Sequence, residues 1–497
     1  MKLRDLFAGI PFDGEWYDEN TEILSVTADS RQVQPGGLFA ALPGTKLDGG
    51  DFIPRALERG AAAVLCEQPP DFPGPWLVVE NARSAYGRLC ANWFGNPADA
   101  LHLAAVTGTN GKTTTTTLLY ELLSGVTGAK VGLIGTNRNL IGGMELPASA
   151  TTPDSYTLQA LLRQMADAGC RYVVMEASSH ALSQCRTAGL RFDVGVFTNL
   201  TRDHLDYHGD MESYRSAKEK LFAQCSRAVL NLDDDAGRWY ESRVPCPVFT
   251  YSENNARADL TARDLRLFPG HVDFVALMRG QLERIHLPIP GGFSVYNALA
   301  ALSAGVCLGL ELPDMARVMR SVKGVKGRVE IVPVPRAFTV IIDYAHSPNA
   351  LENILLTARD VTANRLICLF GCGGDRDRTK RPIMGAVARE LADVVVVTSD
   401  NPRTEDPAAI ISDILSGMGD AADSVYVQPD RKKAIAWCME QGRTGDVIVL
   451  AGKGHEVTQE INGVYYPMDE RKIVEECFQK LSKAPWVKTG NLPGVSV

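Results

Sequence analysis

The residues Gly108–Thr114, GTNGKTT, have the types and spacing of a loop that holds phosphate groups. Its two glycines let the backbone approach phosphate oxygens and direct N–H groups at them. Lys112 can reach the β- and γ-phosphates of a nucleotide, and the hydroxyl of Thr113 or Thr114 can reach Mg²⁺. The general pattern has a further glycine where this chain has Val106, so the match is to a shorter form, G-x-x-G-K-T. Because the loop follows an apolar run and precedes a helical one, it predicts nucleotide binding rather than an ordinary strand–helix turn.

Other polar residues follow predicted strands further along the chain. Glu176 ends the run YVVME, where a carboxylate can hold Mg²⁺, although a capping glutamate has the same appearance. His204 and His208 are four residues apart, but no glutamate stands between them in the order of a zinc-protease helix. We therefore prefer His204 as a partner of Mg²⁺. Lys218 lies on an amphipathic helix, where a solvated lysine is the ordinary interpretation.

The last third of the chain contains motifs that suit a zwitterionic ligand. The segment GCGGDRDRTKRP places Arg376 and further basic residues beside glycines, and DYAHSP places Asp343 at another strand end. DNPR at Asp400–Arg403 offers an arginine that can clamp a carboxylate, while Glu456 in GKGHE can hold an ammonium group. Together these residues predict a site for an amino-acid-like molecule.

The elements that position these residues indicate three α/β domains. Residues 1–97 carry short apolar runs between glycine and proline clusters and indicate a small N-terminal α/β domain. Residues 98–327 alternate strands with helices, which predicts right-handed crossovers and a central, P-loop-like, mostly parallel sheet. Residues 328–497 begin a fresh series of strands whose carboxyl ends are polar, and we expect a Rossmann-like, doubly wound domain with its ligand crevice at those ends.

Composition excludes several classes of protein. A chain of 497 residues with a net charge of −8 lacks the basic surface that a nucleic-acid partner requires. The first residues have no sustained apolar region, so we expect neither a signal peptide nor membrane insertion, but a cytoplasmic protein. The eleven cysteines are scattered and form no CxxC pair, which indicates reduced, mostly buried thiols.

The order of motifs identifies a family. DSR, GTNGKTT, TTP, SSHAL, TNLTRDHLDYHG, YNALAA, DYAHSP, GCGGDRD, DNPR and GKGHE follow one another over nearly the whole chain. In this set the chain resembles the Mur ligases of peptidoglycan synthesis. The resemblance implies an ADP-forming amide ligase that adds meso-2,6-diaminopimelate to UDP-N-acetylmuramoyl-L-alanyl-D-glutamate through an acyl phosphate. It also implies Mg²⁺ as cofactor, ATP as co-substrate and a monomeric protein.

The resemblance also assigns roles to residues of this sequence. It implies catalytic roles for Lys112, Glu176, His204 and Lys218, with Mg²⁺ held by Thr113, Glu176, His204 and a carbamoylated Lys218 (N6-carboxylysine). ATP would contact Gly108, Thr109, Asn110, Gly111, Lys112, Thr113, Thr114, Asn297, Arg328 and Asp343. The UDP-muramoyl peptide would contact Ala28, Ser30, Thr45, Lys46, Leu47, Thr151, Thr152, Ser178, Gln184 and Arg186. Diaminopimelate would contact Arg376, Asp400, Asn401, Pro402, Arg403, Gly452 and Glu456.

Three alternatives stay open at this point. A lysine-adding ligase of the same family would differ mainly around the arginine of DNPR. A ligase like folylpolyglutamate synthase shares the ATP loop and the lysine, but gives no reason for the N-terminal DSR segment or for DNPR. A non-catalytic ATP-binding module would lack the carboxylate or the lysine, and the sequence has both Glu176 and Lys218.

Overall fold

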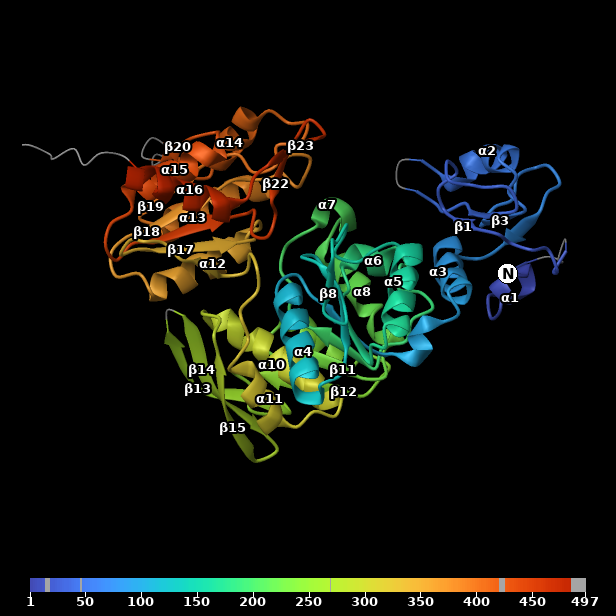
Figure 1. The fold of residues 1–497 in the computed structure, drawn as a ribbon, viewed down its shortest axis with the longest axis horizontal. Helices are drawn as coiled ribbons and strands as arrows, with labels where there is room; N and C mark the ends of the chain where they lie inside the picture. The colour runs from blue at the N-terminus through green and yellow to red at the C-terminus, as the bar shows by residue number, and fades with distance from the viewer. Residues whose placement is uncertain (14–17, 45–46, 269, 420–424, 484–497) are drawn as a thin grey trace, which may run out of the picture. The chain divides into compact units, whose positions relative to one another are not determined.

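The structure is a computed structural model that describes residues 1–13, 18–44, 47–268, 270–419 and 425–483 (Figure 1). The chain divides into two compact units. The first contains residues 1–266, 272–288 and 293–323, and the second contains residues 267–271, 289–292 and the described chain from residue 324.

The first unit begins with a small parallel sheet in the order β1-β2-β3-β4. Its strands are short and almost wholly apolar, and α1 and α3 bury Leu3, Leu6 and Leu89 against one face. The Asn81 side chain accepts a hydrogen bond from Ser84 N and so caps α3. The elements are α1 (Leu3–Leu6), β1 (Val26–Thr27), β2 (Leu38–Ala40), η1 (Gly49–Phe52), α2 (Ile53–Glu58), β3 (Ala63–Cys66), β4 (Trp76–Val78), α3 (Ala82–Trp93) and η2 (Pro97–Ala100).

A second sheet of the chain has eleven strands in the order β15-β14-β13-β12-β11-β10-β5-β9-β6-β7-β8. In the order of the sheet, the six strands β12, β11, β10, β5, β9 and β6 are parallel to one another, whereas β7–β8 and β14–β15 are antiparallel hairpins at the edges. Its strands are β5 (His102–Thr107), β6 (Val131–Ile134), β7 (Asn139–Ile141), β8 (Met144–Leu146), β9 (Tyr172–Glu176), β10 (Val194–Phe197), β11 (Ala228–Asn231), β12 (Val248–Ser252), β13 (Leu260–Phe268), β14 (His271–Met278) and β15 (Gln281–Leu287).

Helices cover both faces of this sheet. α5 places Leu158, Leu162 and Met165 in one core with β5 and β9, as the helical spacing of its apolar residues predicts. The helices of this region are α4 (Lys112–Thr127), α5 (Ser155–Asp167), α6 (Ser179–Ser183), α7 (Leu205–His208), α8 (Met211–Glu219), η3 (Phe222–Gln224), α9 (Asp235–Glu241), α10 (Gly292–Cys307) and α11 (Leu312–Met319).

Strand order explains where the phosphate loop lies. β5 pairs with β9 on one side and with β10 on the other, so the strand order reverses around it. Ligands of open α/β sheets bind at such a switch point, outside the carboxyl ends of the strands. The residues after β5, β9 and β10 are therefore brought to one place.

The second unit contains a six-stranded sheet in the order β16-β17-β21-β18-β19-β20. Five strands are parallel and β16 joins antiparallel at one edge. α15 packs against α16, while α12, α13 and α14 pack in series (Figure 1). The elements are β16 (Glu330–Val332), β17 (Thr339–Asp343), α12 (Pro348–Asp360), β18 (Leu366–Phe370), α13 (Lys380–Leu391), β19 (Val394–Val397), α14 (Pro407–Leu415), β20 (Tyr426–Val427), α15 (Arg431–Gln441), β21 (Val447–Ala451), β22 (Thr458–Ile461), β23 (Val464–Pro467) and α16 (Glu470–Lys483).

The α/β fold class is confirmed, with a mostly parallel central sheet and a mixed C-terminal sheet. All eleven cysteines are described and none forms a disulfide; six are buried and the others are half-buried. Among the described helices, none combines the length and the apolar character needed to cross a bilayer.

Candidate active site

The phosphate loop connects β5 to α4, whose first residue is Lys112. Gly111 has a φ of 84°, in the region that glycine adopts without strain. A Cβ on Gly108 would collide with Thr198 Oγ1, and one on Gly111 with Asn297 Oδ1. The loop therefore needs glycine at both positions. The Lys112 ammonium donates to Gly108 O at 2.9 Å and to Thr109 O at 2.8 Å, so it lies across its own loop.

Glu176, the last residue of β9, meets the first turn of α4. Its side chain is 1% exposed and accepts hydrogen bonds from Thr113 Oγ1 at 3.1 Å, Thr136 Oγ1 at 3.0 Å and Thr136 N at 2.8 Å. Within the described chain, no basic side chain forms an ion pair with this carboxylate. A buried negative charge is costly when no positive charge lies beside it. Carboxylate and hydroxyl oxygens are the donors that Mg²⁺ prefers, so Thr113 and Glu176 fit the metal that the family implies.

Thr136 is a residue that sequence reasoning missed. It follows β6, whose neighbour in the sheet is β9, and its Oγ1 also lies 3.0 Å from Thr151 Oγ1, whose hydroxyl can donate to it. Gly135 beside it leaves room for Glu176, because a Cβ there would lie 2.6 Å from Glu176 Oε1. The only signal in the sequence is a Gly-Thr pair directly after an apolar strand.

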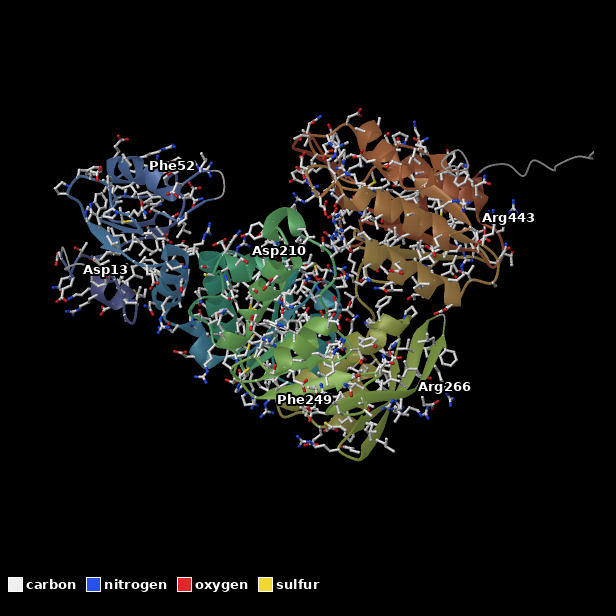
Figure 2. The ribbon with its side chains drawn as sticks, turned by 180° about the vertical axis from the view of Figure 1, so that it is seen from behind. Asp13, Phe52, Asp210, Phe249, Arg266 and Arg443 are labelled. Carbon is white, nitrogen blue, oxygen red and sulfur yellow. The ribbon has the colours of Figure 1, made fainter. Side chains whose placement is uncertain are left out.

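Lys218 is buried inside the first unit. It lies on α8, a helix capped by Asp210, the residue labelled in Figure 2. The Asp210 side chain accepts a hydrogen bond from Ser213 N at 2.7 Å. Its ammonium lies 4.4 Å from the centre of the Tyr214 ring, and no carboxylate of the described chain forms an ion pair with it. Burial lowers the pKa of Lys218 well below its usual value, and the positive charge of Lys112 lowers it further. The expectation of a solvated lysine from amphipathicity alone is therefore wrong.

Tyr214 connects Lys218 to the phosphate loop. Its hydroxyl is 3.2 Å from Thr109 Oγ1, and the His208 ring stacks on it with centroids 4.9 Å apart. Burial and the neighbouring His180 lower the pKa of His208 to about 4, and its Nε2 is 2.9 Å from Ser179 Oγ.

His204 opens α7 in the left-handed conformation, with a φ of 55° and Nε2 3.6 Å from Asp203 Oδ2. Non-glycine residues in that region gather at functional sites because the strain must be held by the surroundings. His204 and His208 belong to no group of three close ligand side chains among the described residues, which gives zinc no support.

A cavity of about 550 Å³ lies between the small sheet and α5. Three of the residues that the resemblance assigns to the UDP-muramoyl peptide, Ala28, Gln184 and Arg186, line it. Arg186 Nη1 donates to Thr152 O at 2.7 Å, and Thr152 Oγ1 donates to Glu176 O at 2.7 Å. Thr152 Oγ1 also accepts from Ser178 N at 3.0 Å, which joins these residues to the end of β9.

Some predicted substrate residues lie elsewhere. Ser30 is buried and is not among the cavity residues, and Leu47 is 67% exposed. Thr45 and Lys46 fall outside the described residues. The cavity is also lined by Arg83, Tyr86, Asp154 and Tyr156, which no motif indicated because they come from α3 and from the start of α5.

The predicted adenosine residues divide between the units. Asn297 is buried on α10 of the first unit, against Gly111. In the second unit, the Asp343 carboxylate accepts from Val329 N at 2.7 Å and the Arg328 guanidinium lies 4.7 Å from the Tyr344 ring centre. Burial raises the pKa of Asp343, while Arg328 opposes that shift.

Polar residues gather at the carboxyl ends of β19 and β21 in the second unit. Asn401 Nδ2 donates to Glu456 Oε2 at 2.9 Å, and the buried Lys453 donates to Asn401 Oδ1 at 2.8 Å and to Glu456 Oε2 at 2.5 Å. Gly452 has a φ of 112°, and a Cβ there would lie 3.3 Å from Asp400 Oδ2. The sequence did not predict a role for Lys453, although this residue lies inside GKGHE. Its burial depends on distant residues and cannot be read from its neighbours in the sequence.

Arg403 completes this cluster. Its Nη1 donates to Gly374 O at 2.7 Å, its Nε lies 3.3 Å from Glu460 Oε2, and its φ is 52°. Gly374 of GCGGDRD packs against the backbone of DNPR, and a Cβ on it would collide with Pro402 O. This close approach explains why the position is glycine. Arg376, by contrast, is exposed and donates to Asp375 O at 3.1 Å within its own loop.

Comparisons with known proteins match most of the chain. The family models "Mur ligase family, catalytic domain", "Mur ligase middle domain" and "Mur ligase, glutamate ligase domain" match residues 22–89, 106–305 and 327–454. A protein of Geobacillus thermodenitrificans is 44% identical over 95% of this chain and 98% of its own length. One of Clostridioides difficile is 40% identical over 97% of this chain and all of its own. Both are called UDP-N-acetylmuramoyl-L-alanyl-D-glutamate–2,6-diaminopimelate ligase.

Solved structures agree with these matches. A structure of a ligase with the same name is 33% identical, has a TM-score of 0.69, and covers 97% of this chain and 100% of that one. A folylpolyglutamate synthase of Mycobacterium tuberculosis is 18% identical over 80% of this chain with a TM-score of 0.63, which shows a shared fold alone. The chain is a ligase that belongs to the Mur ligase family.

Proposed function

We propose that this ligase uses ATP to join meso-2,6-diaminopimelate to UDP-N-acetylmuramoyl-L-alanyl-D-glutamate in peptidoglycan synthesis. The observation that carries the choice of amino acid is the position of Arg403, whose Nε lies 3.3 Å from Glu460 Oε2, in the same DNPR segment as Asn401, which donates to Glu456 Oε2. The names of relatives that are 40% and 44% identical over nearly the whole chain support the same substrates. Because ATP is the co-substrate, we place the reaction in the cytoplasm.

The reaction requires activation of a carboxylate, which by itself is a poor acyl donor. We propose that the D-glutamyl γ-carboxylate attacks the γ-phosphorus of ATP, giving an acyl phosphate and ADP. Two anions must approach each other in this step, and positive charge at the phosphates offsets their repulsion. Lys112 supplies that charge once it leaves the carbonyls of Gly108 and Thr109 for the phosphate oxygens. The amine of diaminopimelate then attacks the acyl carbon, and phosphate leaves.

We propose Mg²⁺ as the cofactor, held by Thr113 and Glu176 with help from His204. When bound there, it supplies positive charge that neutralises the phosphates. Thr136 orients the Glu176 carboxylate through two hydrogen bonds. Outer partners of this kind fix the geometry of a metal ligand.

We further propose that Lys218 is carbamoylated. The carbamate forms when the neutral amine attacks CO₂ and loses a proton, and burial keeps this amine neutral more readily than an exposed one. The product carries one negative charge and two oxygens, so it attracts Lys112 and the metal where an ammonium would repel them.

The amino-acid site explains the preference for diaminopimelate over lysine. Diaminopimelate has a second amino-acid head, whose carboxylate Arg403 can bind and whose ammonium Glu456 can accept. Lysine has no distal carboxylate and cannot form this ion pair with Arg403, and a site that binds a polar group of its substrate discriminates strongly against an analogue that lacks the group.

An assay of ADP release tests this proposal. The purified protein is given ATP, Mg²⁺ and the UDP-muramoyl dipeptide, and meso-diaminopimelate, L-lysine or L-glutamate is added in turn. We expect ADP release that depends on both the dipeptide and diaminopimelate. A faster response to L-lysine would replace our substrate. In a parallel reaction, a folate substrate takes the place of the dipeptide, and ADP release that depends on this folate and L-glutamate would replace the function.

A further inference from the structure

A second cavity, of about 570 Å³, lies in the first unit on the other side of α3 from the substrate cavity. Its walls are α3, the segment 182–191, which begins at the end of α6, and residues 220–225, which follow α8. The residues that line it include Arg88, Arg191 and Lys220, and they include no aspartate or glutamate. In a chain with a net charge of −8, such a concentration of positive charge is a local exception.

The three basic side chains have no acidic partner among the described residues. Arg88, Arg191 and Lys220 are exposed, and none of them forms an ion pair or a side-chain hydrogen bond within the described chain. Clefts lined by one sign of charge focus the field and raise the local concentration of the opposite ion. The cavity is therefore built for an anion.

The walls are packed before any ligand arrives. A Cβ on Gly87 would lie 2.8 Å from Ala188 Cβ, and one on Gly189 would lie 3.1 Å from Arg88 Cα, so α3 rests directly on the segment 182–191. Cys185 in this segment has a φ of 53°, a left-handed conformation that costs energy for a residue with a Cβ. A pre-formed wall lowers the cost of ordering a ligand.

We propose that this cavity is a binding site for a small phosphorylated molecule, separate from the phosphate loop. A phosphate group carries about −1.5 to −2 charges near neutral pH, so about two such groups balance three cations, and one balances most of their charge. Arginine forks match phosphate oxygens bidentately, and lysine adds a point charge. The ligand is either an inorganic phosphate anion or the phosphate of an organic ester, and the apolar lining by Leu182 and Leu190 favours the ester.

The same walls border the proposed substrate cavity. Arg83 and Tyr86 of α3 face that cavity, as do Gln184 and Arg186 of the segment 182–191. Lys220 follows Lys218 by two residues. A ligand that holds these walls together should change the KM for the UDP-muramoyl dipeptide, a consequence that rests on the proposed function, whereas the binding site itself does not.

Alkylation of Cys185 tests the site directly, because this half-buried thiol lines the cavity. The full chain is treated with N-ethylmaleimide in EDTA, with and without pyrophosphate or ribose 5-phosphate, and modified peptides are quantified by mass spectrometry. At ten times the dissociation constant, we expect about tenfold slower alkylation of Cys185. Cys246 is also half-buried but does not line the cavity, and its rate should not change.

A triple variant and a matched control decide whether the cavity is responsible. Protection should be lost in Arg88→Gln/Arg191→Gln/Lys220→Gln. It should persist in Arg320→Gln/Lys323→Gln/Arg389→Gln, which removes the same charge from exposed side chains elsewhere. Equal alkylation of Cys185 with and without both probes, or equal protection in both variants, would overturn the proposal.

Isothermal titration of the same three proteins gives a second readout. We expect the wild type and the control to bind one equivalent more of the preferred probe than the triple variant does. The same number of sites in all three proteins would refute the cavity as a binding site, whatever the outcome for the ligase reaction. A melting curve identifies a variant that fails to fold, and Lys220→Glu alone then replaces it, with loss of protection expected and unchanged protection refuting the site.

Discussion

Replacing Arg403 by alanine should impair the use of diaminopimelate far more than the use of ATP. The guanidinium is tied to Gly374 O and Glu460 and is 21% exposed on its side chain, so it is held in place and only partly screened. Removing one partner of a buried, hydrogen-bonded charge pair costs about 2–5 kcal/mol. Because the Arg403 side chain is partly exposed, we take the lower part of this range, about 2–4 kcal/mol. At 1.4 kcal/mol per tenfold, kcat/KM for diaminopimelate should fall by about 30-fold to about 700-fold.

The assay measures initial rates of ADP release while diaminopimelate, L-lysine and ATP are varied separately. We expect KM for ATP to change less than about threefold, and the preference for diaminopimelate over L-lysine to shrink by the same factor as kcat/KM, since lysine has no distal carboxylate to lose. Arg403→Lys keeps the positive charge but cannot bind a carboxylate through two parallel hydrogen bonds, so its kcat/KM for diaminopimelate should lie between those of the wild type and Arg403→Ala. Arg389→Ala, on the exposed surface of α13, is the control.

Two results would refute this reasoning. Equal losses for diaminopimelate and ATP would show that Arg403 maintains the fold of the second unit or belongs to the nucleotide site. An unchanged preference for diaminopimelate over L-lysine would show that another residue recognises the distal carboxylate.

Three further predictions concern other parts of the chain. Thr136→Val should raise the Mg²⁺ concentration needed for half-maximal activity by about 10- to 100-fold, because Glu176 loses the hydroxyl that orients it, whereas Thr136→Ser should not; equal behaviour of the two variants would contradict this role. With ¹³C-bicarbonate, the wild type should show a carbamate carbon signal by NMR that Lys218→Ala lacks, and its absence from the wild type would exclude the modification. The hydrogen bond from Arg381 lowers the pKa of Glu405 to about 2 from 4.5, so its stabilising contribution is complete above about pH 4.5 and is lost as the pH falls toward 2. Urea unfolding of Glu405→Gln should therefore show lower stability at pH 7 and a smaller loss of stability upon acidification than the wild type, and parallel curves for the two proteins would contradict this.

The local motifs were predictable because neighbours in the sequence carry the information. GTNGKTT predicts the turn from β5 to α4, since its glycines and the first helical residue are consecutive. The alternation of apolar runs and helices predicts parallel sheets, and the strands β17, β18, β19 and β21 lie where their apolar runs indicated. The edge hairpins β7–β8 and β14–β15 were not predicted, because two adjacent strands with polar exposed faces give a weak pattern.

Contacts between distant segments were not predictable from one sequence. Thr136 meets Glu176 only because β6 and β9 are neighbours in the sheet, and Lys453 is buried only because β19 and β21 bring Asn401 and Glu456 around it. The ordinary expectation of a solvated lysine gave the wrong environment for Lys218, since it is buried together with Tyr214 and Ala217 on a helix that α6 and α7 contact, and one sequence does not reveal those contacts. The domain boundaries at residues 97 and 327 and the monomeric state stay predictions.

The central claim is that ATP activates the D-glutamyl carboxylate as an acyl phosphate, and the path of an oxygen atom tests it most directly. The UDP-muramoyl dipeptide is prepared with ¹⁸O in its γ-carboxylate and converted with ATP, Mg²⁺ and diaminopimelate, and the products are analysed by mass spectrometry. We predict one ¹⁸O atom in the inorganic phosphate for each labelled carboxylate consumed, because the carboxylate oxygen that attacks phosphorus leaves with it. Phosphate without ¹⁸O, or the label in AMP, would contradict the account.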